Sequence, residues 1–408
     1  MGIPSEDVVL IKQSENPADS SVITVNCPDK TGLGCDLCRI LLFFGLSIVR
    51  GDVSTDGKWC YIVFWVVGKP TTRWSLLKKR LISACPSFYG IYYYKQELEQ
   101  PKTPDVFLLK FRGVDRKGLL HDVTHVLCEL ELIIKRVKVS TTPDGTVVDL
   151  FFITDTRELL HTKKRKEDTH DHLKAYLGDA MITCEIELIG AEIATCSQGT
   201  SFLPPAITED MFSLELSNEH SSGSSTPNVS VTADNSLSPS HTLIQIICQD
   251  HKGLLYDIMR TLKDYNIQIS YGRFYIKEKK KCEVDLFVMQ MDGKKIVDPN
   301  KQNSLCSRLR MELVRPLRVA IVSRGPDMEL LVANPVELSD KGRPLVFHDI
   351  TLALKMLNTC IFTAEVGRHV MGDREWEVYR ILLDEGDGLS LSWNKIEGEV
   401  RKMLMGWE

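Results

Sequence analysis

Three short polar loops carry the residues best suited to chemistry in this 408-residue chain. In each loop a glycine stands three positions after an aspartate, a leucine follows at once, and a helical pattern begins there. Backbone N–H groups at a helix start favour a carboxylate, and a neighbouring aspartate can accept hydrogen bonds from an ammonium group. The loops therefore predict sites for the two ends of a free amino acid. The candidate ligand-binding residues are Asp29, Gly32, Leu33, Asp115, Gly118, Leu119, Asp250, Gly253 and Leu254.

The same loops also have a purely structural explanation. Glycine permits a turn that other residues resist, and an aspartate can hydrogen-bond to nearby backbone. The residue types alone support both interpretations equally, so the choice between a ligand site and a simple turn stays open at this point.

Two His-Asp dipeptides, at residues 121–122 and 348–349, are typical of metal-dependent phosphohydrolases. The corresponding dipeptides elsewhere in the chain are Cys35-Asp36 and Tyr256-Asp257, so the aspartate persists while the histidine varies. A metal site also needs further ligands at fitting geometry. We therefore predict a structural role for the aspartate and no metal site.

The remaining reactive groups give weaker signals. Cys35 and Cys38 have the spacing of a redox motif, but no second cysteine pair accompanies them at zinc-ligand spacing. Residues 163–166, Lys-Lys-Arg-Lys, form either a nuclear import signal or a solvated helix start. The sequence contains no GxxxxGK[ST], GxGxxG, HExxH or GxSxG motif. We predict a non-enzymatic protein with no catalytic residues and no cofactor.

A four-fold internal repeat positions these loops. Each copy has a first-turn aspartate, a leucine five positions later and an isoleucine twelve positions later, beginning at Asp36, Asp122, Asp257 and Asp349. A strand-like run precedes the loop, an amphipathic helix follows it, and a hairpin, a second helix and a last strand complete the unit. The order βαββαβ is that of the ferredoxin-like fold.

The sequence thus predicts an α+β protein made of four ferredoxin-like modules with antiparallel sheets. We expect the modules to pair side by side, which covers their edges and open faces. Module one spans 1–101, module two 102–190, module three 241–326 and module four 327–408. Residues 191–240 form a Ser/Pro-rich linker, within which 211–216 has strand character. We expect two pairs of modules, one on each side of this tether.

Module four and the N-terminal residues depart from the repeat. Module four has a longer loop, with Asp340 and Gly342, which puts its ligand site in doubt, and no room for a last strand. Residues 8–11 read as a spare strand, which we expect to fill an open sheet edge in module four.

Composition narrows the function further. The net charge of −5 disfavours an obligate nucleic acid partner, and no segment approaches the length of a membrane span. The twelve cysteines are scattered without a signal-peptide pattern, so we expect free, mostly buried thiols. A cytoplasmic location is the expectation, with the nucleus as the alternative because of the basic run.

The three glycine loops, each opening a βαββαβ module, resemble the signature of ACT domains, which are small amino-acid-binding regulatory modules. A chain of four such modules resembles the plant ACT domain repeat proteins and is similar to the ACT pair of bacterial uridylyltransferase nitrogen sensors, in which glutamine is the signal. The resemblance implies a regulatory amino-acid sensor, with the nine loop residues contacting a ligand between paired modules. It also implies an unidentified protein partner.

Two alternatives stay open. The modules can instead form a structural protein–protein interaction scaffold that binds no metabolite. A nucleotidyl-transfer or hydrolysis enzyme, as in the bacterial proteins, is disfavoured because catalytic motifs are missing. A homodimer through sheet edges is compatible with either of the first two readings.

Overall fold

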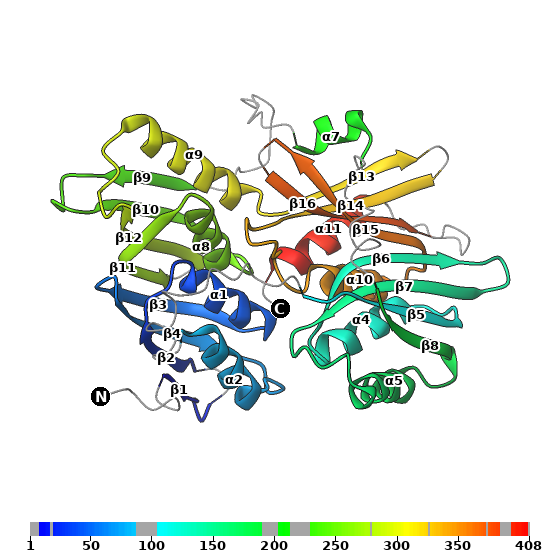
Figure 1. Cartoon of the computed structure of the whole chain (residues 1–408). Coiled ribbons are helices and arrows are strands. Elements are labelled where there is room, and N and C mark those ends of the chain that lie inside the picture. Colours follow the sequence, from blue (N-terminus) through cyan, green and yellow to red (C-terminus); the bar gives the residue numbers. More distant parts are fainter. Residues whose placement is uncertain are drawn as a thin grey trace. The chain divides into compact units, whose positions relative to one another are not determined.

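The computed structural model describes residues 8–16, 19–86, 104–189, 203–212, 229–277, 280–324, 327–372, 374–383 and 393–406. The chain folds into two compact lobes (Figure 1). Lobe A combines Met1–Glu99 with Asn218–Pro316, and lobe B combines Gln100–Ser217 with Leu317–Gly406. Each lobe therefore draws on two segments that are far apart in the sequence.

Lobe A is an eight-stranded antiparallel sheet in the order β1-β2-β4-β3-β11-β12-β10-β9. Four helices pack beside one another in the order α2, α1, α8, α9, and one hydrophobic core runs through both modules. The strands are β1 Val9–Lys12, β2 Ser21–Pro28, β3 Ser47–Thr55, β4 Trp59–Val67, β9 Ser230–Asp234, β10 Thr242–Gln249, β11 Ile267–Ile276 and β12 Lys281–Gln290. The helices are α1 Leu33–Phe43, α2 Trp74–Ala84, α8 Leu254–Asp264 and α9 Pro299–Val314.

Lobe B repeats this architecture with the order β13-β14-β16-β15-β6-β7-β5-β8 and the helix row α5, α4, α10, α11. The strands are β5 Phe107–Val114, β6 Leu132–Thr141, β7 Thr146–Asp155, β8 Met181–Leu188, β13 Arg318–Arg324, β14 Asp327–Pro335, β15 Ile361–Met371 and β16 Arg374–Leu383. The helices are α4 Leu119–Glu129, α5 Lys163–Leu177, α7 Pro205–Phe212, α10 Val346–Met356 and α11 Trp393–Met405, with a short 3-10 turn at Gly178–Ala180.

The predicted fold class is confirmed: the modules are ferredoxin-like and paired side by side. The expected grouping on each side of the linker is corrected, because module one pairs with module three through β3 and β11, and module two pairs with module four through β6 and β15. In every module the strand after the first helix lies at an edge of the module's own strands. Joining two such edges gives hydrogen-bond partners to the backbone N–H and C=O groups of both edge strands.

The outer edge strand distinguishes module two from the other three. Its strand β8 comes last in the module, as in the order βαββαβ, and pairs with β5. In the other modules the equivalent place is taken by a strand that precedes the module, namely β1, β9 or β13. The structure thereby corrects three expectations: the N-terminal strand belongs to module one and not to module four, residues 230–234 are a strand and not linker, and β13 pairs in module four and not in module three.

The linker contributes a helix where the sequence suggested a strand. Helix α7 ends at Phe212, and residues 213–216 lie outside the described part of the chain. Met211 and Phe212 form a small core with Leu331, Trp376 and Val378. Because Leu330 and Val332 belong to the main core on the helix side, α7 covers the opposite face of this sheet.

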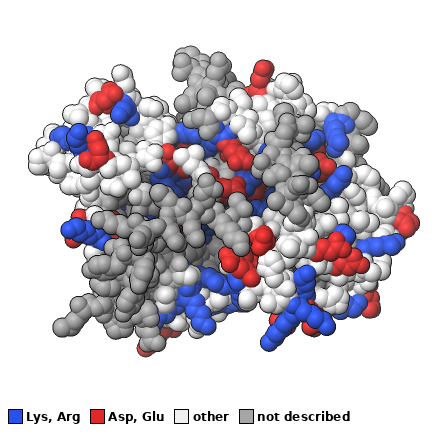
Figure 2. Space-filling view, in the orientation of Figure 1, with Lys and Arg blue, Asp and Glu red and all other residues white. Residues whose placement is uncertain are grey.

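Burial and charge explain several remaining sequence features. Of the eleven cysteines within the described ranges, six are buried and five are half-buried. None of the helices in those ranges combines the length and apolar character needed to cross a bilayer. On the face shown in Figure 2, basic and acidic side chains are interspersed and form no continuous basic field.

Candidate functional site

The three predicted loops share one backbone conformation at the start of α1, α4 and α8. Gly32, Gly118 and Gly253 precede the helices with φ of 79°, 76° and 82°, in the left-handed region that favours glycine. Each glycine carbonyl accepts the N–H of the helix aspartate, at 3.0–3.1 Å. In module four Leu345 takes the same place with φ of 64°, so this loop keeps the conformation without the glycine.

A cavity lies at each of the three loops, between the paired modules. The Gly32 cavity holds about 110 Å³, and its lining includes Asp29, Gly32 and Leu33. The Gly118 cavity and the Gly253 cavity hold about 20 Å³ each and are bordered by the corresponding three predicted residues of their loops. Since one water needs about 10–15 Å³ on such a measure, the two small cavities fit a water molecule and the Gly32 cavity fits a small organic ligand.

Two glycines at the module interface distinguish the lining of the Gly32 cavity from the equivalent places in lobe B. Gly51 in β3 and Gly272 in β11 occupy equivalent places, fifteen residues after the helix aspartate, and both line this cavity. In lobe B the same places hold Val137 and Ala364. A Cβ at Gly51 would lie 3.4 Å from Phe64 and 3.8 Å from Leu255 of the paired module, which are ordinary contacts. A Cβ at Gly272 would lie 2.7 Å from Leu286, so the space there is already filled and only Gly51 leaves room for a side chain.

In each lobe, a lysine from one module lies over a glycine loop of the other module. The side chain of Lys263 in α8 covers Gly32, so a Cβ there would lie 2.8 Å from its Cε. Lys355 in α10 covers Gly118 in the same way. The ammonium groups reach the helix aspartates, with Lys263 Nζ 3.7 Å from Asp36 Oδ1 and Lys355 Nζ 2.6 Å from Asp122 Oδ1. Each lobe thus brings a cation to the loop of one module.

The first helices of modules one and two have no lysine at the equivalent position. Lys263 and Lys355 stand six residues after the helix aspartates of modules three and four, where modules one and two have Leu42 and Cys128. Leu42 lines the Gly253 cavity. These two lysines were not among the predicted site residues, although comparing this one position among the four copies would have singled them out.

The helix aspartates do more than complement the helix dipole. Arg116 also binds Asp122, with Nη2 2.6 Å from Oδ2. Burial would raise the pKa of Asp122, but hydrogen bonds from Lys355 and Arg116 outweigh it and lower the pKa below its ordinary value. Asp36 contacts Lys30 and Arg39 at 3.3 and 3.1 Å as well as Lys263. These carboxylates therefore fix the cations beside the loops.

The loop aspartates are anchored to their own modules. Asp29 Oδ1 accepts the backbone N–H of Lys30 at 2.8 Å, and Oδ2 accepts the hydroxyl of Thr55 at 2.6 Å. The backbone N–H groups of Asp115 and Asp250 donate to the carbonyls of Gly145 and Lys280 in the facing hairpins. These hydrogen bonds provide the predicted turn, while Asp29 still lines the cavity.

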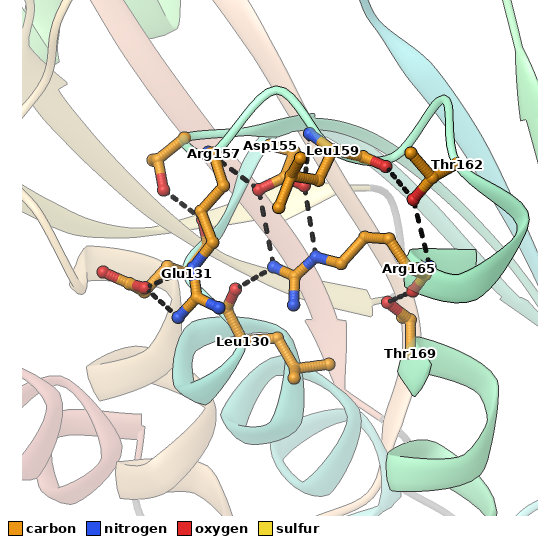
Figure 3. A network of polar contacts seen from close by, with 9 residues as sticks. Leu130, Glu131, Asp155, Arg157, Leu159, Thr162, Arg165 and Thr169 are labelled. Atoms are coloured by element: carbon orange, nitrogen blue, oxygen red, sulfur yellow. Dashed lines mark hydrogen bonds and ion pairs between the residues drawn. The ribbon is translucent and has the colours of Figure 1, made fainter. Parts of the chain in front are cut away.

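The basic run at the start of α5 is partly structural. Arg165 is buried, and its guanidinium donates to Asp155 and to the carbonyl of Leu130 (Figure 3). The hydroxyl of Thr162 accepts the backbone N–H of Arg165 and caps the helix. Lys163 and Lys164 are exposed, so only part of the run is available to a partner.

The cysteine pair does not form a reactive site. Cys35 and Cys38 are both buried in α1. Burial raises the pKa of Cys38, which opposes formation of the nucleophilic thiolate. Cys38 instead contributes to the wall shared by the Gly32 and Gly253 cavities.

Comparison with known proteins gives matches along most of the chain. Three family models match the chain. The model described as "ACT domain-containing protein ACR10, N-terminal" matches residues 11–86, "ACR9-like, ACT-like domain" matches residues 230–327, and "ACT domain-containing protein ACR9, C-terminal" matches residues 328–406. ACT domain-containing protein ACR10 of Arabidopsis thaliana is 64% identical over 415 residues, covering 100% of both chains. ACT domain-containing protein ACR9 of the same plant is 55% identical, again over 100% of both chains.

A shorter similarity involves a bacterial enzyme. The bifunctional uridylyltransferase/uridylyl-removing enzyme of Azospirillum brasilense is 34% identical over 86 residues, which are 21% of this chain and 9% of that protein. The similarity is therefore confined to about one module.

Proposed function

We propose that this chain, which belongs to the plant family of ACT domain-containing proteins that includes ACR9 and ACR10, is a non-enzymatic regulatory protein that binds a free amino acid in the Gly32 cavity. The observation that carries the proposal is a cavity of about 110 Å³ at a helix start, whose lining includes both Asp29 and Lys263 of the paired module. The amino acid's carboxylate binds Lys263 and the first-turn amides of α1, and its ammonium group binds Asp29.

The walls of the Gly32 cavity suit the rest of such a ligand. Ile62, Phe64 and Leu255 supply apolar surface, and Gln268 and Arg273 lie at the same cavity. Such a mixture of apolar walls and a few polar groups is typical of small-molecule sites. The Lys263–Asp36 distance of 3.7 Å, against 2.6 Å for Lys355–Asp122, favours Lys263 as the lysine that turns to a ligand.

Ligand binding acts through the pairing of modules one and three. The ligand would contact α1 and β3 of one module and α8 and β11 of the other, so it favours whichever arrangement of the two it fits better. A protein partner in the cytoplasm or nucleus would respond to that arrangement.

Calorimetric titration of the full chain with each of the twenty amino acids, glutamine first, tests the proposal. We expect one of them to bind, and Lys263→Met to weaken the affinity about tenfold or more, because it removes a charged hydrogen bond. Gly51→Val, which introduces the residue type found at position 137, should abolish binding by filling the cavity.

Lys355→Met is the matched control, since it makes the same change at the equivalent lysine of lobe B and should leave the affinity unchanged. Absence of heat with every amino acid would refute the proposal and favour the interaction scaffold.

A further inference from the structure

Three histidines from two modules meet in lobe B. His121 and His125 lie on α4 and His348 lies on α10, and one ring nitrogen of each lies within 4.8 Å of the others. The ring centroids of His121 and His348 are 4.9 Å apart, and His125 Nδ1 is 3.4 Å from His348 Nε2. From the sequence no metal site was predicted at His121 or His348, because the histidine varies among the four copies and no further ligand was identified; in the structure His125 lies beside them.

Carboxylates lie near the ring nitrogens of His348 and His125 that face away from this cluster. His348 Nδ1 lies 3.4 Å from Asp349 Oδ1, and His125 Nε2 lies 3.7 Å from Glu129 Oε1. A carboxylate on the far nitrogen is the usual way to orient a metal-binding histidine. His121 Nδ1 lies 3.3 Å from the hydroxyl of Thr351.

We propose that His121, His125 and His348 bind a divalent transition-metal ion of the Zn²⁺ or Ni²⁺ class. Three imidazoles with an open position for water make a recognised zinc site. Metal–nitrogen distances of about 2.0–2.1 Å in a tetrahedral site place the nitrogens about 3.4 Å apart, so the widest pair must close by up to about 1.4 Å. His125, whose side chain is 34% exposed, can supply that movement.

The surrounding charge is compatible with a cation. Asp122, Glu129 and Asp349 lie near the rings, and the nearby Lys355 is paired with Asp122.

The repeat shows that this cluster is peculiar to lobe B. His121 and His348 occupy equivalent places one residue before the helix aspartates, where lobe A has Cys35 and Tyr256. The place of His125 in module four is taken by Leu352. His125→Leu therefore introduces a residue that the fold already accepts at the equivalent position.

Titration of the full chain with Zn²⁺, and with Co²⁺ as a spectroscopic probe, tests the site. We expect one equivalent of either metal to bind, a Co²⁺ spectrum of nitrogen and oxygen ligands, and a rise of the melting temperature with Zn²⁺. His125→Leu and His348→Asn should each weaken the affinity about tenfold or more. Circular dichroism verifies that both variants are folded.

The double variant His170→Ala/His172→Ala is the control, because these two histidines are exposed on α5, and it should bind like the original chain. Unchanged affinity in both cluster variants, a thiolate charge-transfer band with Co²⁺, or no binding at all would overturn the proposal. Because the site lies in lobe B, these results are independent of amino-acid binding in the Gly32 cavity.

Discussion

Asp149 in β7 is a buried carboxyl group at the Gly118 cavity. Its side chain is 1% exposed, and its Oδ1 has no hydrogen-bond partner in the described part of the protein. Burial, followed by the charge of Asp115, raises the pKa of Asp149 to about 8. A folded-state pKa above the unfolded value of about 3.9 means that stability present at low pH is lost as the pH rises through 8.

We predict that Asp149→Val removes this loss. The variant should gain on the order of a few kcal/mol in free energy of unfolding at pH 8 and less at pH 5, because the penalty for a buried charge disappears. Urea unfolding at both pH values measures the difference. Parallel shifts at the two pH values would show that Asp149 is not the group that titrates.

Asp285 is the matched control for Asp149. Comparing the two shows that identical local sequence does not guarantee equivalent positions in a strand. Both residues stand in the sequence Val-Asp-Leu-Phe, which suggested equivalent strands. In the structure Asp149 lies opposite Phe111, whereas Val284 and not Asp285 lies opposite Ile246, the equivalent of Phe111. A one-residue shift turns a side chain to the other face, so Asp285→Val should have little pH-dependent effect.

At the scale of elements, the repeat predicted the helices and hairpins well because each depends on local signals. The turns at Gly57 and Gly145, with φ of 83° and 76°, join the hairpins where the sequence placed them. The outer edge of a module can be filled either by a strand that precedes the module, as with β1, β9 and β13, or by one that follows its second helix, as with β8. Periodicity does not encode that choice, so β1, β9 and β13 were assigned to other places.

Strand β1 gives a direct test of edge protection in module one. Val9 is fully buried and pairs with Val25, whereas the neighbouring Leu10 is 51% exposed. Val9→Ala should lower the free energy of unfolding by on the order of 2 kcal/mol, because it removes buried methyl groups, while Leu10→Ala should change it little. Chemical denaturation of the two variants measures both values.

Deletion of residues 1–13 should have a larger effect than Val9→Ala, since it leaves β2 as an exposed edge. We expect a lower melting temperature and light scattering from aggregates. An unchanged melting curve would mean that β1 does not protect this edge.

At the scale of the whole molecule, the sequence correctly predicted that modules pair, but the partners expected from it were wrong. All four modules present the same kind of edge, at β3, β6, β11 and β15, so backbone hydrogen bonding alone permits several pairings. The choice follows from side chains at the interfaces. Gly51 and Gly272 face one another's modules in lobe A, and Thr124 meets Thr351, at 3.1 Å, in lobe B. Such complementarity becomes visible only when the helices lie side by side.

This alternating arrangement makes a split chain informative. A cut after residue 220, outside the described residues, separates modules one and two from modules three and four, so each fragment contains one half of each lobe. We predict that the two fragments associate into a 1:1 complex, because each supplies the edge strands that the other lacks. Size-exclusion chromatography with light scattering measures the complex.

Gly272→Val provides the discriminating variant for the split chain. Its side chain would collide with Leu286 and with Val53 across the interface, at 2.7 and 2.9 Å from the Cβ, and should weaken the association. Gly398→Ala, where a Cβ meets open space, is the control. If the fragments stay separate and each melts cooperatively at the temperature of the intact chain, then pairing across the linker is not what stabilises the lobes.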